Sequence, residues 1–252
     1  MVEETGMLDR GDGVRLAWAR LAGRGPTVVF CPGFNSDMAG AKATALAAFC
    51  AARGQAYLRF DYSGHGSSGG VFTDGTIGRW REDALAVIDR LTTEKVLLVG
   101  SSMGGWIALL VALARAERVA GIVGIAAAPD FTEDLMWEAM APGERKLLLA
   151  EGQILVPNPY GGPYPVTRAL VEEGRRHLLL RDAIALDCPV RLLHGQADRE
   201  VPWETSLRIA ARLRGGDVRL CLVKDGDHRL SRPEDLLLLE QTLAALLGQD
   251  GA

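Results

Sequence analysis

The sequence predicts an α/β protein in which a mostly parallel sheet is covered by helices on both faces. Short apolar runs alternate along the chain with longer stretches whose apolar residues recur at helical spacing. Most of the short runs are apolar throughout, as is typical of strands that are buried on both faces. With 252 residues, of which 48% are hydrophobic, the chain can bury one sizeable core.

The expected elements follow in chain order. The Asp12-Gly13 turn signal predicts that Val14–Leu21 is the second arm of an opening hairpin. Apolar residues at helical spacing predict helices over Trp80–Leu91, Trp106–Leu113 and Leu236–Leu246. The remaining strands are expected at Thr27–Cys31, Ala56–Asp61, Val96–Gly100, Gly121–Ala127, Val190–His194 and Val218–Val223.

One interval interrupts this alternation. About 60 residues from Asp130 to Asp187 separate two expected strands, and they contain helical pieces and a stretch rich in proline, glycine and tyrosine at Pro157–Pro165. We expect a single domain over residues 1–252, with a small helical lid at about 130–187. The alternative is a packed excursion without a role in substrate binding, because long surface insertions are thermodynamically tolerated.

Composition excludes several function classes. The formal charge is −4, and the longest basic cluster is Arg175-Arg176, so we expect no nucleic-acid partner. Apolar runs such as Val119–Ala128 are shorter than the roughly 18 residues of a membrane-spanning helix, so no stable membrane insertion is expected. The acidic start of the chain, with no apolar run after it, predicts a cytoplasmic location. Four separated cysteines predict neither a metal site nor a redox motif, and no cofactor is expected.

A possible nucleophile follows the expected strand at Val96–Gly100. Residues 100–104 read Gly-Ser-Ser-Met-Gly and match G-x-S-x-G, the sharp turn that exposes a serine between a strand and a helix. A second match occurs at Gly66–Gly70, but no helical pattern comes directly after it. The sequence therefore favours Ser102 over Ser68 as a nucleophile.

A serine nucleophile needs a base, and the base needs an orienting acid. His228 lies just beyond an expected strand and ahead of a helix, whereas the other three histidines lie within a strand, in a glycine-rich loop or in the insertion. Asp198 also follows a strand, and the order Ser102, Asp198, His228 is that of an α/β-hydrolase sheet. Because the carboxyl ends of parallel strands share one edge, these three residues are expected to meet there. The competing acids are Asp187, Asp225 and Asp227.

Two further groups of residues complete the predicted site. The backbone N–H groups of Phe34 and Met103 are placed to bind an oxyanion, although Pro32-Gly33 also suits a simple turn. Apolar residues of the insertion predict an acyl pocket, with Phe131, Trp137 and Met140 as substrate contacts. The alternative is that these side chains are buried only against their own domain. The apolar residues considered are Phe131, Leu135, Met136, Trp137 and Met140.

These residues resemble the α/β-hydrolase superfamily, and within it the abhydrolase domain-containing protein 10 group. The resemblance covers nearly the whole chain but weakens at Phe131–Met140 and Leu155–Tyr164. It rests on Pro32–Phe34, Met38–Ala43, Arg59–Gly64, Trp80–Asp83, Val99–Trp106, Arg191–Gly195, Val201–Trp203 and Asp227–Arg229.

The resemblance implies an α/β-hydrolase fold with a mostly parallel eight-stranded sheet, and it places nucleophile, acid and base on Ser102, Asp198 and His228. It implies a palmitoyl-protein thioesterase that also hydrolyses acyl glucuronides. The expected substrates are therefore acyl esters or thioesters, including S-acylated proteins. Open alternatives are a non-catalytic small-molecule receptor on the same fold, and a peptidase or C–C hydrolase of the superfamily. Dehalogenases and epoxide hydrolases are disfavoured because they place aspartate at the position of Ser102.

Overall fold

The computed structural model describes residues 2–158 and 161–248, and in this part of the chain eight strands form the main sheet in the order β1-β2-β4-β3-β5-β6-β9-β10. The β1–β2 and β2–β4 pairs are antiparallel and the other five are parallel. The predicted mostly parallel, eight-stranded sheet is therefore confirmed. Its strands are β1 (Glu4–Asp9), β2 (Arg15–Leu21), β3 (Arg24–Cys31), β4 (Gln55–Phe60), β5 (Val96–Ser101), β6 (Val119–Ile125), β9 (Val190–Gly195) and β10 (Val218–Val223).

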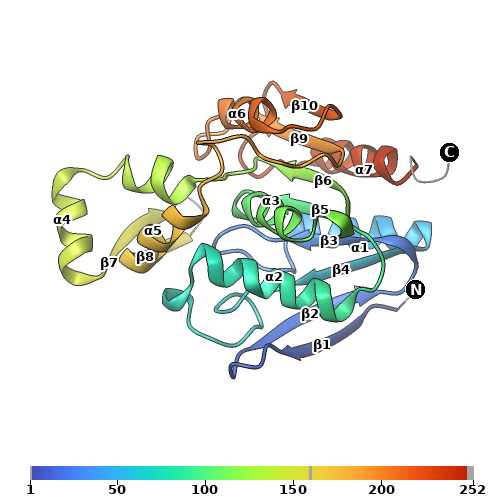
Figure 1. Ribbon diagram of the computed structural model, residues 1–252, viewed down its shortest axis with the longest axis horizontal. Coiled ribbons are helices and arrows are strands. Elements are labelled where there is room, and N and C mark those ends of the chain that lie inside the picture. Colours follow the sequence, from blue (N-terminus) through green and yellow to red (C-terminus); the bar gives the residue numbers. More distant parts are fainter. Residues whose placement is uncertain (1, 159–160, 249–252) are drawn as a thin grey trace.

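Helices cover both faces of the sheet (Figure 1). Buried side chains of α2, α3 and α6 pack on one face, and those of α1 and α7 pack on the other. Two short 3-10 helices, η1 (Phe72–Asp74) and η2 (Ala116–Arg118), lie in the connections. The covering helices are α1 (Ala41–Arg53), α2 (Ile77–Leu91), α3 (Met103–Ala114), α6 (Glu204–Arg212) and α7 (Pro233–Leu247).

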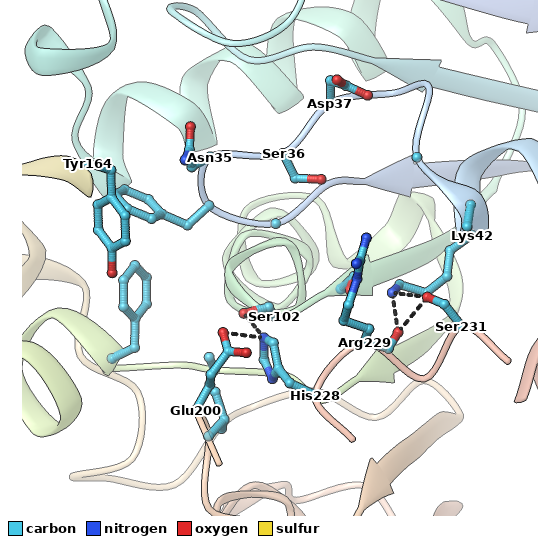
Figure 2. A pocket seen from close by; sticks show the side chains of 18 of the residues that line it. Asn35, Ser36, Asp37, Lys42, Ser102, Tyr164, Glu200, His228, Arg229 and Ser231 are labelled. Carbon is cyan, nitrogen blue, oxygen red and sulfur yellow. Dashed lines mark hydrogen bonds and ion pairs between the residues drawn. The ribbon is translucent and has the colours of Figure 1, made fainter. Parts of the chain in front are cut away.

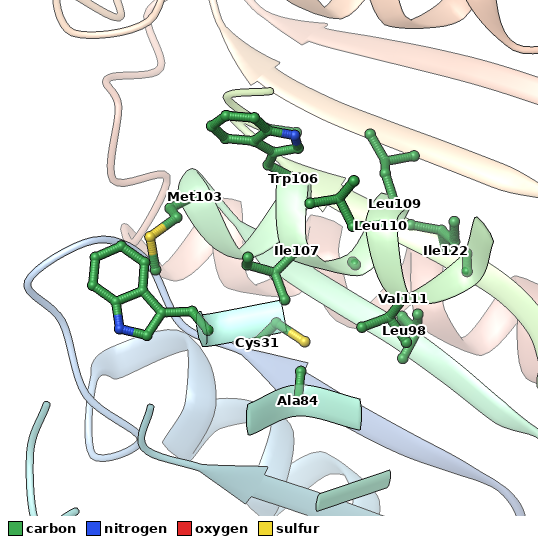
Figure 3. Close-up of a cluster of buried hydrophobic side chains, with 14 of the residues drawn as sticks. Cys31, Ala84, Leu98, Met103, Trp106, Ile107, Leu109, Leu110, Val111 and Ile122 are labelled. Atoms are coloured by element: carbon green, nitrogen blue, oxygen red, sulfur yellow. The ribbon is translucent and has the colours of Figure 1, made fainter. Parts of the chain in front are cut away.

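Alternation along the strands explains why two cores form. In β5, Leu98 belongs to the cluster under α2 and α3, whereas its neighbours Leu97 and Val99 belong to the cluster under α1 and α7. Helix α3 is buried on nearly all sides, and its Trp106 and Ile107 lie among the side chains that form the first cluster (Figure 3). This buried helix begins directly after Ser102, so the core fixes the position of the candidate nucleophile.

Strand β6 and helix α1 differ from the sequence expectation. Strand β6 begins at Val119 and ends at Ile125, two residues earlier than predicted, because Ala126 adopts a positive φ of 44° that ends the strand. Helix α1 has no counterpart among the predicted helices. Its sequence is rich in alanine, and its buried residues Ala43, Leu46 and Cys50 give a weak apolar pattern.

The interval between β6 and β9 forms a separate layer beside the main sheet (Figure 1). A buried carboxylate anchors its two ends, because the backbone N–H groups of Leu179 and Leu180 donate to Asp130 at 2.7 and 2.9 Å. The indole N–H of Trp106 also donates to the carbonyl of His177. Its elements are the π-helix η3 (Thr132–Trp137), α4 (Pro142–Glu151), β7 (Gln153–Asn158), β8 (Gly161–Thr167), α5 (Arg168–Gly174) and the 3-10 helix η4 (Arg175–His177).

The insertion contains helices as expected, but the description as a helical lid is incomplete, because β7 and β8 pair as an antiparallel hairpin. The sequence did not predict this hairpin because it contains prolines, which lack the backbone N–H that hydrogen-bonded strand pairs need. In a two-stranded sheet such residues are tolerated, and Pro165 pairs with Leu155. Pro159 and Tyr160 of the Pro157–Pro165 stretch lie outside the described residues. The hairpin shares a small core of Met140, Leu148, Ile154, Val166 and Val171.

No helix within residues 2–158 and 161–248 has the length and apolar character needed to cross a bilayer.

Candidate active site

Ser102 occupies a strained turn between β5 and α3. Its backbone has φ 53° and ψ −119°, a region that residues with a Cβ rarely adopt. The backbone holds this conformation from both sides: the N–H of Ser102 donates to the carbonyl of Ile125 at 2.9 Å, and its carbonyl accepts from Gly105 and Ala128. The turn projects the serine side chain beyond the carboxyl end of β5, as the motif predicted.

The flanking glycines are required by close backbone contacts. A Cβ at Gly100 would lie 2.2 Å from the carbonyl oxygen of Gly104, and a Cβ at Gly104 would lie 2.0 Å from that of Cys31. Both distances are far below a van der Waals contact with backbone, which cannot move aside. The glycines of the G-x-S-x-G pattern therefore allow the helix to start directly against β3 and β5.

The structure brings the three predicted side chains together at one edge of the sheet. His228 Nε2 lies 3.2 Å from Ser102 Oγ, and His228 Nδ1 lies 2.7 Å from Asp198 Oδ2. Figure 2 shows His228 directed at Ser102. Asp198 follows β9 and His228 follows β10, so parallel pairing of these strands brings both loops to the same edge. The arrangement can move a proton between a hydroxyl and an imidazole whose orientation a carboxylate fixes.

Asp198 is held by four donors. Its Oδ1 accepts the backbone N–H groups of Glu200 and Val201 at 2.8 and 2.9 Å, and its Oδ2 contacts His228 and also His194 Nε2 at 3.1 Å. Burial alone would raise the pKa of Asp198, but the hydrogen bonds of His194 and His228 outweigh it and hold the pKa well below its usual range. The carboxylate therefore stays ionised at neutral pH.

Sequence reasoning did not assign His194 a part in the site. This fully buried residue also contacts Ser206 Oγ through Nδ1 at 2.7 Å, so its ring is fixed from both sides. It thereby fixes Asp198. The spacing of four residues from His194 to Asp198 was a visible signal, but outside a helix it does not predict a contact.

Competing residues from the sequence have other contacts. Ser68 Oγ accepts the N–H of Ala17 and donates to the carbonyl of Asp61, so its hydroxyl stabilises the conformation of its own loop. Asp225 pairs with Arg232 on the surface. Asp227 Oδ1 accepts the backbone N–H groups of residues 229 and 230.

The loop after β3 lies against the serine turn. A Cβ at Gly33 would stand 3.6 Å from Ser102 Cβ, so the loop passes close to the candidate nucleophile. Among the described residues, neither the N–H of Phe34 nor that of Met103 has a hydrogen-bond partner. Both N–H groups are thus available to an oxyanion beside Ser102.

A second loop holds the Phe34 loop in place. The ring of His65, which is buried rather than on the surface, accepts the N–H of Asn35 at Nε2. Burial lowers the pKa of His65 and so favours the neutral ring that can accept this bond. Asp61 accepts the N–H of Met38 at 2.7 Å. Asp61 and His65, which both follow β4, therefore position the candidate oxyanion loop at two points.

A cavity of about 480 Å³ opens at Ser102. On one side its wall is apolar and comes partly from the insertion, with Phe34 in contact with both Phe131 and Tyr164 at ring-centroid distances of 5.8 and 5.4 Å. On the other side its wall is polar and charged (Figure 2). The apolar wall includes Phe34, Phe131, Leu135, Met136, Pro157 and Tyr164, and the polar wall includes Lys42, Arg229 and Ser231. Asn35, Ser36 and Asp37 of the loop after β3 line the cavity between the two walls (Figure 2).

Two of the three predicted substrate contacts lie away from this cavity. Trp137 is covered by the guanidinium groups of Arg145 and Arg175, at 5.2 and 4.9 Å from its ring. Met140 is buried in the small core of the insertion. The expectation for both residues is corrected accordingly: of the predicted set, Phe131 lines the cavity.

A carboxylate that the sequence did not single out lies beside the base. Glu200 lines the cavity, and its Oε2 is 3.8 Å from His228 Nε2. Burial and then the charge of Glu200 raise the pKa of Tyr164. Within the described chain, no group of three or more His, Cys, Asp or Glu side chains is arranged to hold a metal ion.

The chain is similar to known hydrolases over most of its length. The alpha/beta hydrolase family matches residues 28–238. "Palmitoyl-protein thioesterase ABHD10, mitochondrial" is 40% identical over 242 residues in both Mus musculus and Homo sapiens, which is 95% of this chain and 81% and 79% of those proteins. The solved structure of alpha/beta hydrolase domain-containing protein 10 from mouse has a TM-score of 0.91 at 39% identity, covering 98% of this chain and 99% of that one. A putative hydrolase from Agrobacterium vitis has a TM-score of 0.94 at 42% identity, with the same coverage.

These names correct one expectation. The sequence predicted a cytoplasmic location from the acidic first residues, but the mouse and human relatives are named as mitochondrial proteins. The composition of the first residues therefore does not decide the location.

Proposed function

Because this chain belongs to the alpha/beta hydrolase family, we propose that it cleaves carboxylic esters or thioesters through an acyl-enzyme on Ser102, with fatty-acyl thioesters as its main substrates. One observation supports this above all others: the two ring nitrogens of His228 contact Ser102 and Asp198 at 3.2 and 2.7 Å. A hydroxyl at this distance from an oriented imidazole is set up for nucleophilic catalysis.

The first half of the reaction forms the acyl-enzyme. Ser102 Oγ attacks the carbonyl carbon while His228 Nε2 takes the hydroxyl proton, and the ionised Asp198 stabilises the resulting imidazolium through Nδ1–H. The carbonyl oxygen becomes an oxyanion that accepts the N–H groups of Phe34 and Met103. The bond to the leaving oxygen or sulfur then breaks, and His228 gives its proton to the leaving atom.

The second half releases the acid. Water attacks the acyl carbonyl and gives a proton to His228, a second oxyanion forms in the same place, and collapse returns the proton to Ser102. Preorganised N–H donors matter here, since removal of one oxyanion donor typically costs about 2.7–4 kcal/mol of transition-state stabilisation. Every proton in this cycle starts and ends on water, substrate or protein.

The apolar wall supports a fatty-acyl substrate. Phe131, Leu135 and Met136 of the insertion line the cavity next to Ser102, where the acyl chain of a bound substrate would lie. Burial of a methylene on this wall contributes about 0.8 kcal/mol. The names of the mouse and human relatives describe palmitoyl-protein thioesterases, and we extend this activity, with S-acylated proteins as substrates, to the present chain.

We further propose that the chain works as a single domain in which residues of about 130–187 form the lid. Phe131, Leu135 and Met136 follow β6, and Tyr164 lies in β8, so residues from the start and from the middle of the insertion line the cavity. If the insertion had no role in binding, the apolar wall of the cavity would be formed only by loops of the main sheet.

The test compares initial rates on three substrates: a palmitoyl thioester, an acyl glucuronide and an aminoacyl amide. We expect multiple turnovers, fastest on the thioester, and loss of activity in Ser102→Ala. Ser68→Ala is the matched control because Ser68 lies in the second G-x-S-x-G match, and it should keep its turnover. Preference for the amide would assign a peptidase, and binding without turnover would assign a receptor; either result overturns the proposal.

A further inference from the structure

The polar side of the cavity carries two cations that the mechanism above does not use. Lys42 lies in the first turn of α1, and Arg229 directly follows the base His228. The two residues are joined, because Lys42 Nζ donates to the backbone carbonyl of Arg229 and lies 3.4 Å from Ser231 Oγ. Figure 2 shows Lys42, Arg229 and Ser231 together on one side of Ser102.

The charge of Lys42 has no carboxylate partner. Among the described residues, no Asp or Glu oxygen lies within 4.0 Å of Lys42 Nζ, and its contacts are to neutral oxygens. The carboxylate of Asp37, which also lines the cavity, accepts the N–H of Ala39 and lies apart from Lys42 in Figure 2. Burial and then the charge of Arg229 lower the pKa of Lys42 to about 8, while Asp227 and Asp235 act in the opposite direction from farther away. A half-buried ammonium with neutral partners favours an anion nearby.

The position of the cations identifies which part of the substrate they meet. His228 must hand its proton to the leaving atom, so the leaving group lies on the His228 side of the scissile bond. Arg229 is next to this base in the chain, and Lys42 bonds the carbonyl of Arg229. The apolar wall around Tyr164 lies on the opposite side of Ser102 in Figure 2. The acyl chain and the leaving group therefore meet walls of different chemistry.

We propose that Lys42 and Arg229 form a binding subsite for a carboxylate of the leaving group, and that in a protein substrate this carboxylate belongs to an Asp or Glu next to the acylated cysteine. This inference rests on the proposed thioesterase function. The subsite is open enough for a polypeptide, since Arg229 is exposed, as are Asn35 and Ser36 on the facing loop. A hydrogen-bonded ion pair in a partly buried setting is expected to change kcat/KM about tenfold.

The test uses short peptides that carry an S-octanoyl cysteine and differ in the adjacent residue, which is Asp, Asn or Lys. Release of the free thiol is followed for the wild type, Lys42→Met, Lys42→Arg and a control, Lys95→Met. Lys95 is exposed just before β5, at the end of the sheet opposite Ser102, and the control removes the same charge. Each enzyme is described by the ratio of kcat/KM for the Asp peptide to that for the Asn peptide. This ratio cancels any general loss of folded enzyme.

We expect a ratio of about ten for the wild type, Lys95→Met and Lys42→Arg, and a ratio within about twofold of one for Lys42→Met. The Lys peptide should be the slowest for the wild type. The wild-type ratio should fall as the pH rises through about 8, where Lys42 loses its proton. The hydrogen bond from Arg232 lowers the pKa of Asp235, so this carboxylate stays ionised and does not reverse the change.

The outcomes separate this inference from the proposed function. No thiol release from any peptide by the wild type would overturn the function itself. Equal rates on the Asp and Asn peptides, or a ratio that Lys42→Met leaves unchanged, would overturn the subsite alone. A parallel pair of small thioesters, of 3-mercaptopropionate and its amide, distinguishes the source of the carboxylate. Charge preference in this pair but not in the peptides would overturn the assignment to an acidic residue beside cysteine.

Discussion

Replacing Asp198 by asparagine changes the site at a single atom. The remaining oxygen can still accept the N–H groups of Glu200 and Val201, but an NH₂ group now faces His228 Nδ1 and His194 Nε2. This NH₂ is satisfied when His228 Nδ1 accepts, which moves the imidazole proton to Nε2, opposite the serine hydroxyl. The base then carries its proton on the wrong nitrogen and cannot take another from serine.

The expected size of this effect follows from the role of the carboxylate. Loss of the correct tautomer lowers kcat by about 10⁴ in serine hydrolases with intact geometry, which corresponds to about 5.4 kcal/mol. The stability effect is smaller. Two charge-assisted contacts, from His194 and His228, are lost from a buried carboxylate, so we expect the free energy of unfolding to fall by about 2–3 kcal/mol.

Initial rates with a p-nitrophenyl ester and urea unfolding measure the two effects separately. Asp225→Asn is the control, because Asp225 was a competing acid and pairs with Arg232 at the surface. It should keep kcat within about twofold and unfold at nearly the same urea concentration as the wild type, because exposed ion pairs contribute little to stability. An Asp198→Asn enzyme that stays folded and retains more than about a tenth of the wild-type kcat would refute the role of this carboxylate.

Three further predictions concern the turn, the acid limb of stability and the acyl wall. Gly104→Ala should lower the free energy of unfolding by about 3 kcal/mol, because its Cβ would lie 2.0 Å from the carbonyl oxygen of Cys31. The control is Gly143→Ala in α4, whose Cβ would meet nothing within 4 Å, and it should be neutral or stabilising by up to about 1 kcal/mol. Urea unfolding compares the two, and equal losses would contradict the reasoning. The lowered pKa of Asp198 means that its ionised form stabilises the fold above about pH 4, the unfolded value, and that this contribution is lost as the pH falls further. The Tm advantage of the wild type over Asp198→Asn should therefore shrink from pH 5 towards about pH 2 in calorimetric scans, and a constant difference would speak against it. Along a series of p-nitrophenyl esters, kcat/KM should rise by up to about fourfold per methylene until the wall at Leu135 is covered. A flat series would remove the acyl pocket.

The sequence predicted most of the sheet and the residues of the serine, histidine and aspartate cluster. Strands that are buried on both faces leave short apolar runs, as in β5 (Val96–Ser101) and β6 (Val119–Ile125). The rule that parallel strands present their carboxyl ends at one edge then joined Ser102, Asp198 and His228, which are far apart in the chain. The local pattern alone did not distinguish Ser102 from Ser68; the helix after Ser102 did.

Side-chain directions in the insertion could not be predicted in the same way. An ordinary helical period groups Phe131 with Leu135, and both line the cavity. The π-helix from Thr132 to Trp137 changes the angular step between residues, and Trp137 faces arginine side chains instead. The β7–β8 hairpin was not predicted because proline is unfavourable in a strand unless the strand lies at the edge of a sheet, which the sequence alone does not reveal.

The residues that contact Asp198, His228 and Arg229 from neighbouring elements could not be predicted from the sequence either. His194 in β9 contacts Asp198 in the loop that follows, and Glu200 of the same loop lies beside His228. Lys42 approaches Arg229 from a helix 187 positions away in the chain. Such contacts depend on loop conformations that carry no periodic signal. The roles of His194, Glu200 and Lys42 can be assigned only from the folded structure, in which they lie near His228.

The most direct test of the acyl-enzyme is its capture. The protein is mixed with an octanoyl thioester, quenched in acid within the first turnover, and analysed by intact mass and peptide mapping. We expect a mass increase of one octanoyl group located on Ser102, absent in Ser102→Ala and in the wild type after substrate is exhausted. An octanoyl group found on another residue, or steady turnover by Ser102→Ala, would contradict the account.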